Sequence, residues 1–279
     1  METIVPTAAV AYLQTCKLLN KPFTVKANST LNQKYGVAST ELPPTGVYPN
    51  LGYIGIGNKG ASYELAPGNF MLTRPVPHLA RHAALYNMIP FIVRPANDDL
   101  SASERANYRL RVPMTTSGGE NVIAYYLKPL DLAAVTPDLE LRNVNNGVIT
   151  STPFSYALSD LSPTPPVISN VNLNNPDGDY LVASAKTIFT LNQAEIVNVM
   201  EACTILYGDP GYAAINEVAL VTGLDKVIQG VINGVATNYT EVICAQIATF
   251  IAQNHTLTSS STEVKIGLNI GSVDPLLIS

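Results

Sequence analysis

A chain of 279 residues is long enough to bury a hydrophobic core and to form one large or two small domains. Only 13% of its residues are charged, about half the usual share of a soluble domain, whereas 47% are apolar. The net charge of −5 comes without a block of Lys and Arg, which argues against direct nucleic-acid binding, and no run approaches the roughly 18 apolar residues of a membrane span.

The shortage of charged residues is the main compositional signal. A monomer surrounded by water normally carries more surface charge, so we expect much of the surface to contact other subunits; an ordinary neutral globular protein is the alternative.

The three cysteines, Cys16, Cys203 and Cys244, are odd in number and widely spaced, which favours neither a disulfide framework nor a metal site. The N-terminus lacks the basic and apolar regions of a signal peptide, so we expect the protein to stay in the cytoplasm until it is assembled.

Residues 1–50 are predicted to form a helix followed by an extended arm. Thr7 can cap a helix over residues 8–20, which Pro22 stops. Residues 24–50 are polar and interrupted by proline and glycine, which favours an extended conformation. We expect this arm to lie across a neighbouring subunit.

Residues 51–161 are predicted to form a β-rich domain. A strand over residues 51–57 carries glycines that face a close neighbour, residues 61–77 have the composition of a loop, and residues 78–88 follow a helical pattern. Further signals predict a strand at 91–94, a short helix from the capping box Ser101–Glu104 to Asn107, a hairpin of 108–112 with 121–127, and a hairpin of 139–144 with 148–152.

Residues 162–179 are predicted to be a Pro- and Asn-rich connector, because Ser162-Pro-Thr-Pro-Pro166 is stiff and extended. Residues 180–279 are expected to form an α+β region packed on the first domain. Its predicted elements are a strand at 180–190, a helix from a capping box at Thr190–Gln193 to Tyr207, a strand at 214–221, a helix at 240–253 and a strand at 263–270. Hairpins mixed with a few helices predict an α+β fold.

His78 and His82 are the first candidates for chemistry. On a helix the i,i+4 spacing would place both on one face, as zinc requires, but a zinc site needs further ligands. The two histidines lack the intervening Glu of zinc proteases, and His255 is remote. We therefore expect no metal, and interpret the pair as a polar helix face beside Arg81.

Gly55, Gly57 and Gly60 form a Gly-x-Gly-x-x-Gly pattern. A dinucleotide fold would require a helix to open there, with an acidic residue about twenty positions later after a second strand. Residues 61–77 contain several prolines and no helical pattern. We expect tight backbone packing around a turn, and no cofactor.

The densest cluster of charges combines Asp98, Asp99 and Glu104 with Arg94 and Arg105. Paired carboxylates can perform acid–base chemistry, but acidic residues at a helix start also complement the helix dipole. Helix capping with salt bridges at a subunit contact is the simpler interpretation. We predict no catalytic residue.

Three segments carry a family resemblance: Gly52–Gly57, Leu85–Arg94 and Tyr207–Gly223. Together they resemble structural proteins of contractile-tailed bacteriophages, in particular T4-like baseplate wedge subunits. The resemblance implies a non-enzymatic virion protein, made in the host cytoplasm, in which the strand Ile215–Leu220 contacts a neighbouring subunit. The absence of tryptophan and the predicted Ala- and Val-rich C-terminal helix depart from wedge subunits.

The leading hypothesis is thus a tail or baseplate component that forms homo- or hetero-oligomers with other virion proteins. A neck, connector or tail-terminator protein and a capsid decoration protein are alternatives within the virion. A metal- or nucleotide-dependent enzyme that uses the histidines or the glycine loop, and a carbohydrate-binding protein, are alternatives of other classes. Because Arg and Tyr suit interface cores, the predicted contact residues are Tyr53, Arg94, Arg105, Arg109, Arg111 and Tyr125.

Overall fold

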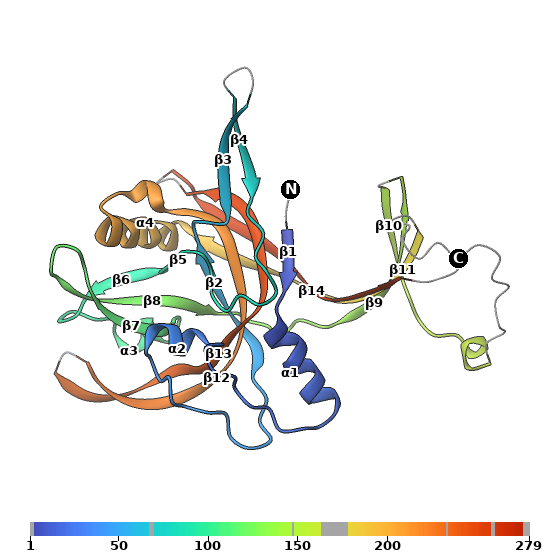
Figure 1. Ribbon diagram of the computed structural model, residues 1–279, viewed down its shortest axis with the longest axis horizontal. Helices are drawn as coiled ribbons and strands as arrows, with labels where there is room; N and C mark the ends of the chain where they lie inside the picture. The colour runs from blue at the N-terminus through green and yellow to red at the C-terminus, as the bar shows by residue number, and fades with distance from the viewer. Residues whose placement is uncertain are drawn as a thin grey trace. The chain divides into compact units, whose positions relative to one another are not determined.

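The computed structural model describes residues 3–66, 70–146, 148–162, 178–232, 234–257 and 260–275. It is a β-rich α+β fold of antiparallel sheets with a few helices (Figure 1), as the hairpin signals predicted. The chain forms two compact units: unit 1 comprises residues 1–131 and 191–264, and unit 2 comprises residues 132–190 and 265–279. No helix in the described ranges has the length and apolar character needed to cross a membrane.

Unit 1 is built on an eight-stranded sheet in the order β1-β13-β12-β2-β8-β6, with β5 paired to β2 and β7 paired to β8. Its central strands β12 and β13 are buried on both faces over residues 217–223, 241–248 and 250–252. The strands are β1 (Thr3–Pro6), β2 (Asn50–Gly57), β5 (Met88–Ile89), β6 (Ile92–Pro95), β7 (Arg109–Thr115), β8 (Asn121–Pro129), β12 (Ala214–Ile232) and β13 (Val235–Thr256).

Residues 215–220, expected to contact another subunit, lie inside this sheet. Residues 217–220 pair with β2 on one side and with β13 on the other, so both edges of this stretch are occupied by strands of the same chain. A two-stranded hairpin of β3 (Ala61–Ala66) and β4 (Phe70–Pro75) stands away from the sheet in Figure 1. This hairpin corrects the predicted loop at 61–77.

The helices of unit 1 begin at capping residues that accept a hydrogen bond from the first turn. The boxes at Thr30 and Ser101 are complete, which confirms the predicted box at Ser101–Glu104. The predicted box at Thr190–Gln193 is displaced, because β11 continues to Asn192, which caps the helix with Glu195. The helices are α1 (Ala8–Leu18), α2 (Leu31–Tyr35), α3 (Ala102–Arg105) and α4 (Gln193–Tyr207).

The arm predicted at residues 24–50 is partly built into unit 1. Leu31 is fully buried in the core, and Asn32 is 2% exposed. The Asn32 amide donates to the carbonyls of Val37 and Val242, at 2.9 and 2.8 Å, and accepts from the Ala245 N–H at 2.8 Å. The arm therefore forms hydrogen bonds to β13 of the same chain. The extended-arm interpretation did not anticipate these bonds.

Two predicted helices are wrong. Residues 240–253 belong to β13, because apolar residues at helical spacing also fit a strand buried on both faces, and this stretch is rich in β-branched residues. Residues 78–88 form turns that lead into β5, since Pro75 and Pro77 precede them and side chains rather than helix carbonyls accept from the N–H groups of Leu79, Tyr86 and Asn87.

Unit 2 contains a four-stranded sheet in the order β10-β9-β11-β14. The predicted hairpin at 139–152 is confirmed, whereas most of the predicted connector, residues 163–177, lies outside the described residues. Few side chains of this sheet are buried, chiefly Val182, Phe189, Ile266 and Leu268. The strands are β9 (Asp138–Asn145), β10 (Val148–Pro153), β11 (Gly178–Asn192) and β14 (Glu263–Pro275), and a 3-10 turn follows β10 at Leu158–Leu161.

Replacing Asn32 with Ala should destabilise unit 1. The substitution leaves the buried carbonyl of Val242 and N–H of Ala245 without their partner, so we expect the free energy of unfolding to fall by about 2–4 kcal/mol. Asn238→Ala, at an exposed asparagine of β13, is the control and should change it by about 0.5 kcal/mol or less. Urea titration followed by circular dichroism measures both; equal losses would contradict the anchoring role.

Candidate functional site

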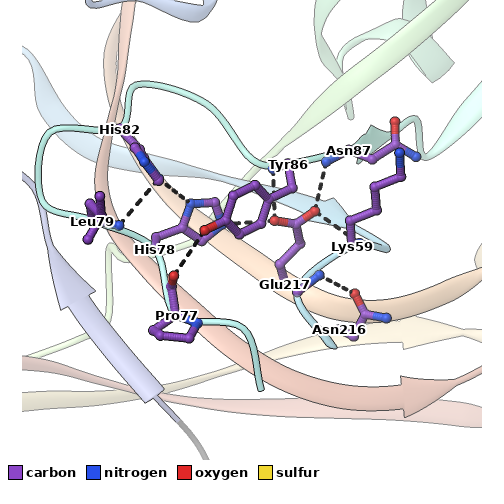
Figure 2. A network of polar contacts seen from close by, with 10 residues as sticks. Lys59, Pro77, His78, Leu79, His82, Tyr86, Asn87, Asn216 and Glu217 are labelled. Atoms are coloured by element: carbon purple, nitrogen blue, oxygen red, sulfur yellow. Dashed lines mark hydrogen bonds and ion pairs between the residues drawn. The ribbon is translucent and has the colours of Figure 1, made fainter. Parts of the chain in front are cut away.

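The carboxylate of Glu217 is at the centre of a dense polar network in unit 1; it is 0% exposed and lies near the start of β12. It accepts from His78 Nε2 at 2.9 Å and from three backbone N–H groups (Figure 2). These belong to Asn87 at 2.9 Å, Tyr86 at 3.0 Å and Lys59 at 3.2 Å. A buried carboxylate is tolerated only with such partners, because it has lost its hydration.

The glycine pattern makes the space for this carboxylate. A Cβ atom at Gly57 would lie 2.6 Å from Glu217 Oε1 and from the Asn87 carbonyl oxygen. One at Gly60 would lie 2.2 Å from the Asn216 carbonyl oxygen, while the Gly60 N–H donates to Asn216 Oδ1 at 2.7 Å. The predicted close packing is thus confirmed, and β3 follows where a dinucleotide fold would place a helix.

His78 and His82 lie in the loop 76–87 rather than on a helix face. The Leu79 N–H donates to His82 Nδ1 at 3.3 Å, so that nitrogen carries a lone pair. Its 3.2 Å contact with His78 Nδ1 then requires a proton on His78 Nδ1. One further proton lies between His78 Nε2 and Glu217. It resides either on Nε2, which gives an imidazolium beside a carboxylate, or on Glu217, which gives a neutral imidazole beside a carboxylic acid.

The ring of His78 is held between two aromatic rings. Its centroid lies 3.9 Å from that of Phe250 and 4.1 Å from that of Tyr86, with interplanar angles of 9° and 19°. The Tyr86 hydroxyl donates to the Pro77 carbonyl at 2.9 Å, which closes the loop on itself. Both faces of the imidazole are therefore covered, and the orientation of the His78 ring is fixed.

The network shifts two pKa values. Burial acts to raise the pKa of Glu217, but the hydrogen bonds from His78 and from the N–H groups of Asn87, Tyr86 and Lys59 outweigh it and lower the pKa. The pKa of His82 is lowered by burial and by the nearby His78 and Arg81. Protonation of His82 would add a proton at Nδ1, where Leu79 and His78 already donate.

These residues hold the loop 76–87 against the sheet. The Glu217 carboxylate ties the loop 76–87 to β12, and the loop in turn accepts from the Ala8 N–H at its Ala80 carbonyl, 2.8 Å away. Both ring nitrogens of His78 are engaged within the chain. Across the described ranges, no three His, Cys, Asp or Glu side chains converge in a way that could hold a metal ion.

Three further carboxylates brace the sheet. Glu241, 1% exposed, accepts from the N–H groups of Leu110 at 2.6 Å, Val242 at 2.8 Å and Arg111 at 2.9 Å, and burial raises its pKa. Asp225 receives two hydrogen bonds from the Arg109 guanidinium, and Asp99 receives one from Arg111. Sequence reasoning missed Glu217, Glu241 and Asp225, although a carboxylate inside an apolar strand is itself a sign of a buried polar group.

The six predicted contact residues all have partners within unit 1. The hydroxyls of Tyr53 and Tyr125 donate to Asp225 and Asp99, each at 2.7 Å, and four of the six are less than 9% exposed. Arg94 and Arg111 are half-buried, and Arg94 donates to the Val93 carbonyl. Their role in contacts with other subunits stays a prediction, but exposed residues are now better candidates.

Among the surface cavities in the described part of unit 1, two lie near α4 and β6, and the residues given for their linings do not include the Glu217 network. One, of about 400 Å³, follows α4 and is mainly apolar: it is lined by Val197, Met200, Glu201, Thr204, Ile205 and Pro210. The other, of about 730 Å³, is lined by Pro95, Ala96, Asn97, Glu120, Asn121, Val122, Ile205 and Gly234.

The whole chain, residues 1–279, matches the model of a family of unknown function (DUF7208). The chain belongs to this family. No curated protein and no solved structure gives a significant match. A functional proposal for this protein therefore rests on its own residues.

Replacing Gly57 with Ala tests the space around Glu217. The added methyl group would press on the carboxylate and on the Asn87 backbone, so we expect a loss of about 2 kcal/mol or more in the free energy of unfolding. Gly52→Ala in the same strand is the matched control, because its nearest neighbour lies 3.9 Å away. That control should be neutral or slightly stabilising; similar losses in both variants would refute the close packing of Gly57 on Glu217.

His82 should make the stability fall as the pH drops from 7 to 5. In the unfolded chain its pKa is near 6.5, and folding lowers it, so between the two values the unfolded state binds more protons. His82→Asn keeps an acceptor near the Nδ1 position but cannot titrate. We expect the stability loss between pH 7 and pH 5, measured by urea unfolding, to be smaller in this variant; identical pH profiles would show that His82 stays uncoupled from folding.

Proposed function

We propose that this protein is a non-enzymatic structural subunit of a tailed-phage virion, most suited to the tail or baseplate. The phage assignment rests on the resemblance of Gly52–Gly57, Leu85–Arg94 and Tyr207–Gly223 to such proteins. The structural role rests on one observation: several parts of the chain expose large apolar side chains that do not pack into its core.

The segment after β10 carries three of the most exposed of these side chains. Leu158, Leu161 and Tyr156 are 84%, 80% and 71% exposed. We propose that this segment lies across a partner subunit. Permanent interfaces bury large and comparatively apolar areas, which is the environment that these side chains lack in the free chain.

The outer half of the β12–β13 hairpin supports the same role. Beyond Gly223, within the described ranges, β12 and the stretch of β13 opposite it pair with each other and with no further strand, as far as Ile232 and Val235. Val227, Val231 and Val235 are each at least 63% exposed. A two-stranded ribbon is only marginally stable in water, so packing against a partner would stabilise it.

The arm contributes as well. Leu42 and Val47 are 64% and 41% exposed within residues 24–50, and Leu18 at the end of α1 is 87% exposed. The mechanism we propose is mechanical: the Glu217 network holds unit 1 rigid, while these exposed segments lie on neighbouring subunits and lock a symmetric assembly.

A neck, connector or tail-terminator protein and a capsid decoration protein would use the same exposed surfaces, so they remain alternatives for the position in the virion. A metal- or nucleotide-dependent enzyme is the weaker candidate. It would depend on His78, His82 and the glycine loop. Both ring nitrogens of His78 and Nδ1 of His82 are hydrogen-bonded within the Glu217 network, and Glu217 and Asn216 fill the space beside two of the glycines.

Sedimentation of the purified chain, alone and with the proteins encoded beside it, tests this proposal. We expect a closed oligomer or a stoichiometric complex. The triple variant Tyr156→Ser, Leu158→Ser, Leu161→Ser should weaken association at least tenfold while its melting temperature stays within about 2 °C of the wild type, because these side chains are exposed in the monomer. A wild-type chain that sediments as a monomer both alone and with these proteins would contradict the proposal.

A further inference from the structure

We propose that two copies of the chain join edge to edge through β10, with their strands antiparallel and a twofold axis at Thr150. The second copy is then one partner of the assembly subunit proposed above, so the pairing rests on that function. Three features support it: the position of β10 in the sheet, its composition and the direction of its backbone groups.

Strand β10 is the outermost strand on one side of the sheet of unit 2. The Phe154 N–H donates to the Leu139 carbonyl at 2.9 Å, which fixes the phase of the β9–β10 ladder. Val148, Thr150 and Thr152 therefore point their backbone groups toward β9. Ile149 and Ser151 point theirs outward, where no strand of the described ranges pairs with them.

Nothing in the composition of β10 protects this edge. All six of its residues are exposed, with Val148 and Ile149 at 64% and 60%, and none is charged. Monomeric proteins usually block an edge with charged residues or proline. The opposite edge strand, β14, carries Glu263 and Lys265, whereas the proline of β10 stands at its last position, Pro153.

A twofold axis at Thr150 gives the register in which every outward donor of β10 is used. Ile149 then faces Ser151 of the partner subunit, and the two residues exchange both of their N–H···O=C bonds. The symmetric pair does the same, so all four outward N–H groups are satisfied. Pro153, which has no N–H to donate, marks the natural end of the ladder.

The side chains fit this register as well. Thr150 lies opposite its own copy, and Val148 lies opposite Thr152 of the partner subunit, so that β-branched residues pair across the axis. No like charges meet, because β10 is uncharged. The nearest charges on β9, Glu140 and Arg142, are paired with each other, and Glu140 also binds Lys186.

The pairing should be weak in isolation. A few residues of strand bury much less than the roughly 1,600 Å² of a standard interface, so β10 alone would hold two copies only transiently. In an assembly the other contacts raise the local concentration and make the same pairing persistent. A covalent trap is therefore the appropriate probe.

Thr150→Cys supplies that trap. At the axis the two residues form a non-hydrogen-bonded pair with Cα atoms about 4.5 Å apart, within the range of a disulfide. The native cysteines Cys16, Cys203 and Cys244 are all buried, so background cross-linking should be low. We expect mild oxidation with copper phenanthroline to convert at least half of this variant into a dimer that dithiothreitol reverses.

Thr152→Cys is the matched control, with the same residue type on the same face of the strand. Its copies would be offset by four residues, or about 13 Å, so we expect less than a tenth of the cross-linking. Mixing Val148→Cys with Thr152→Cys should restore it, since these residues face each other. Adding Ser151→Pro to Thr150→Cys removes one donor and should abolish the cross-link.

Equal cross-linking of Thr150→Cys and Thr152→Cys, or none in either, would overturn the β10 pairing. If the wild type still forms a stoichiometric complex in sedimentation, only this inference fails and the assembly function stands. If Thr150→Cys cross-links specifically but the wild type ignores its neighbouring proteins, the dimer stands and the proposed virion function fails.

Discussion

Unit 1 depends on the carboxylate of Glu217, buried at the centre of its sheet. A charge in that position requires several donors, and three of them are backbone N–H groups of segments distant in the chain. Each donor fixes the path of the segment that supplies it. One side chain thereby sets the turn after β2, the loop 76–87 and the entry into β5, and through Ala80 it also reaches the start of α1.

The same carboxylate explains two features that suggest catalysis when viewed alone. The glycine pattern is needed because a side chain at Gly57 or Gly60 would occupy the space of Glu217 and its neighbours. The two histidines lie close together because His78 satisfies the carboxylate and His82 satisfies His78. The lowered pKa of His82 links this network to the pH dependence of folding.

The two units differ in the size of their buried core. Unit 1 encloses a large apolar core around residues such as Tyr125 and Phe250, which are at most 1% exposed, and leaves side chains such as Leu18 and Val227 uncovered at its periphery. The described part of unit 2 is a sheet with few buried side chains and with Leu158 and Leu161 largely exposed. The low charge content is consistent with this pattern, because many of the large side chains that the chain leaves uncovered are apolar rather than charged.

The sequence by itself determined the elements whose signals are local. The hairpin of β9 and β10, the capping box at Ser101 and the helix after Thr7 each depend on residues within a few positions of one another. Tertiary structure decided the rest. Residues 240–253 became a strand because their neighbours cover both faces, which apolar spacing does not reveal. The Glu217 site was out of reach for the same reason: its carboxylate and His78 are 139 positions apart, and only the folded sheet brings them together.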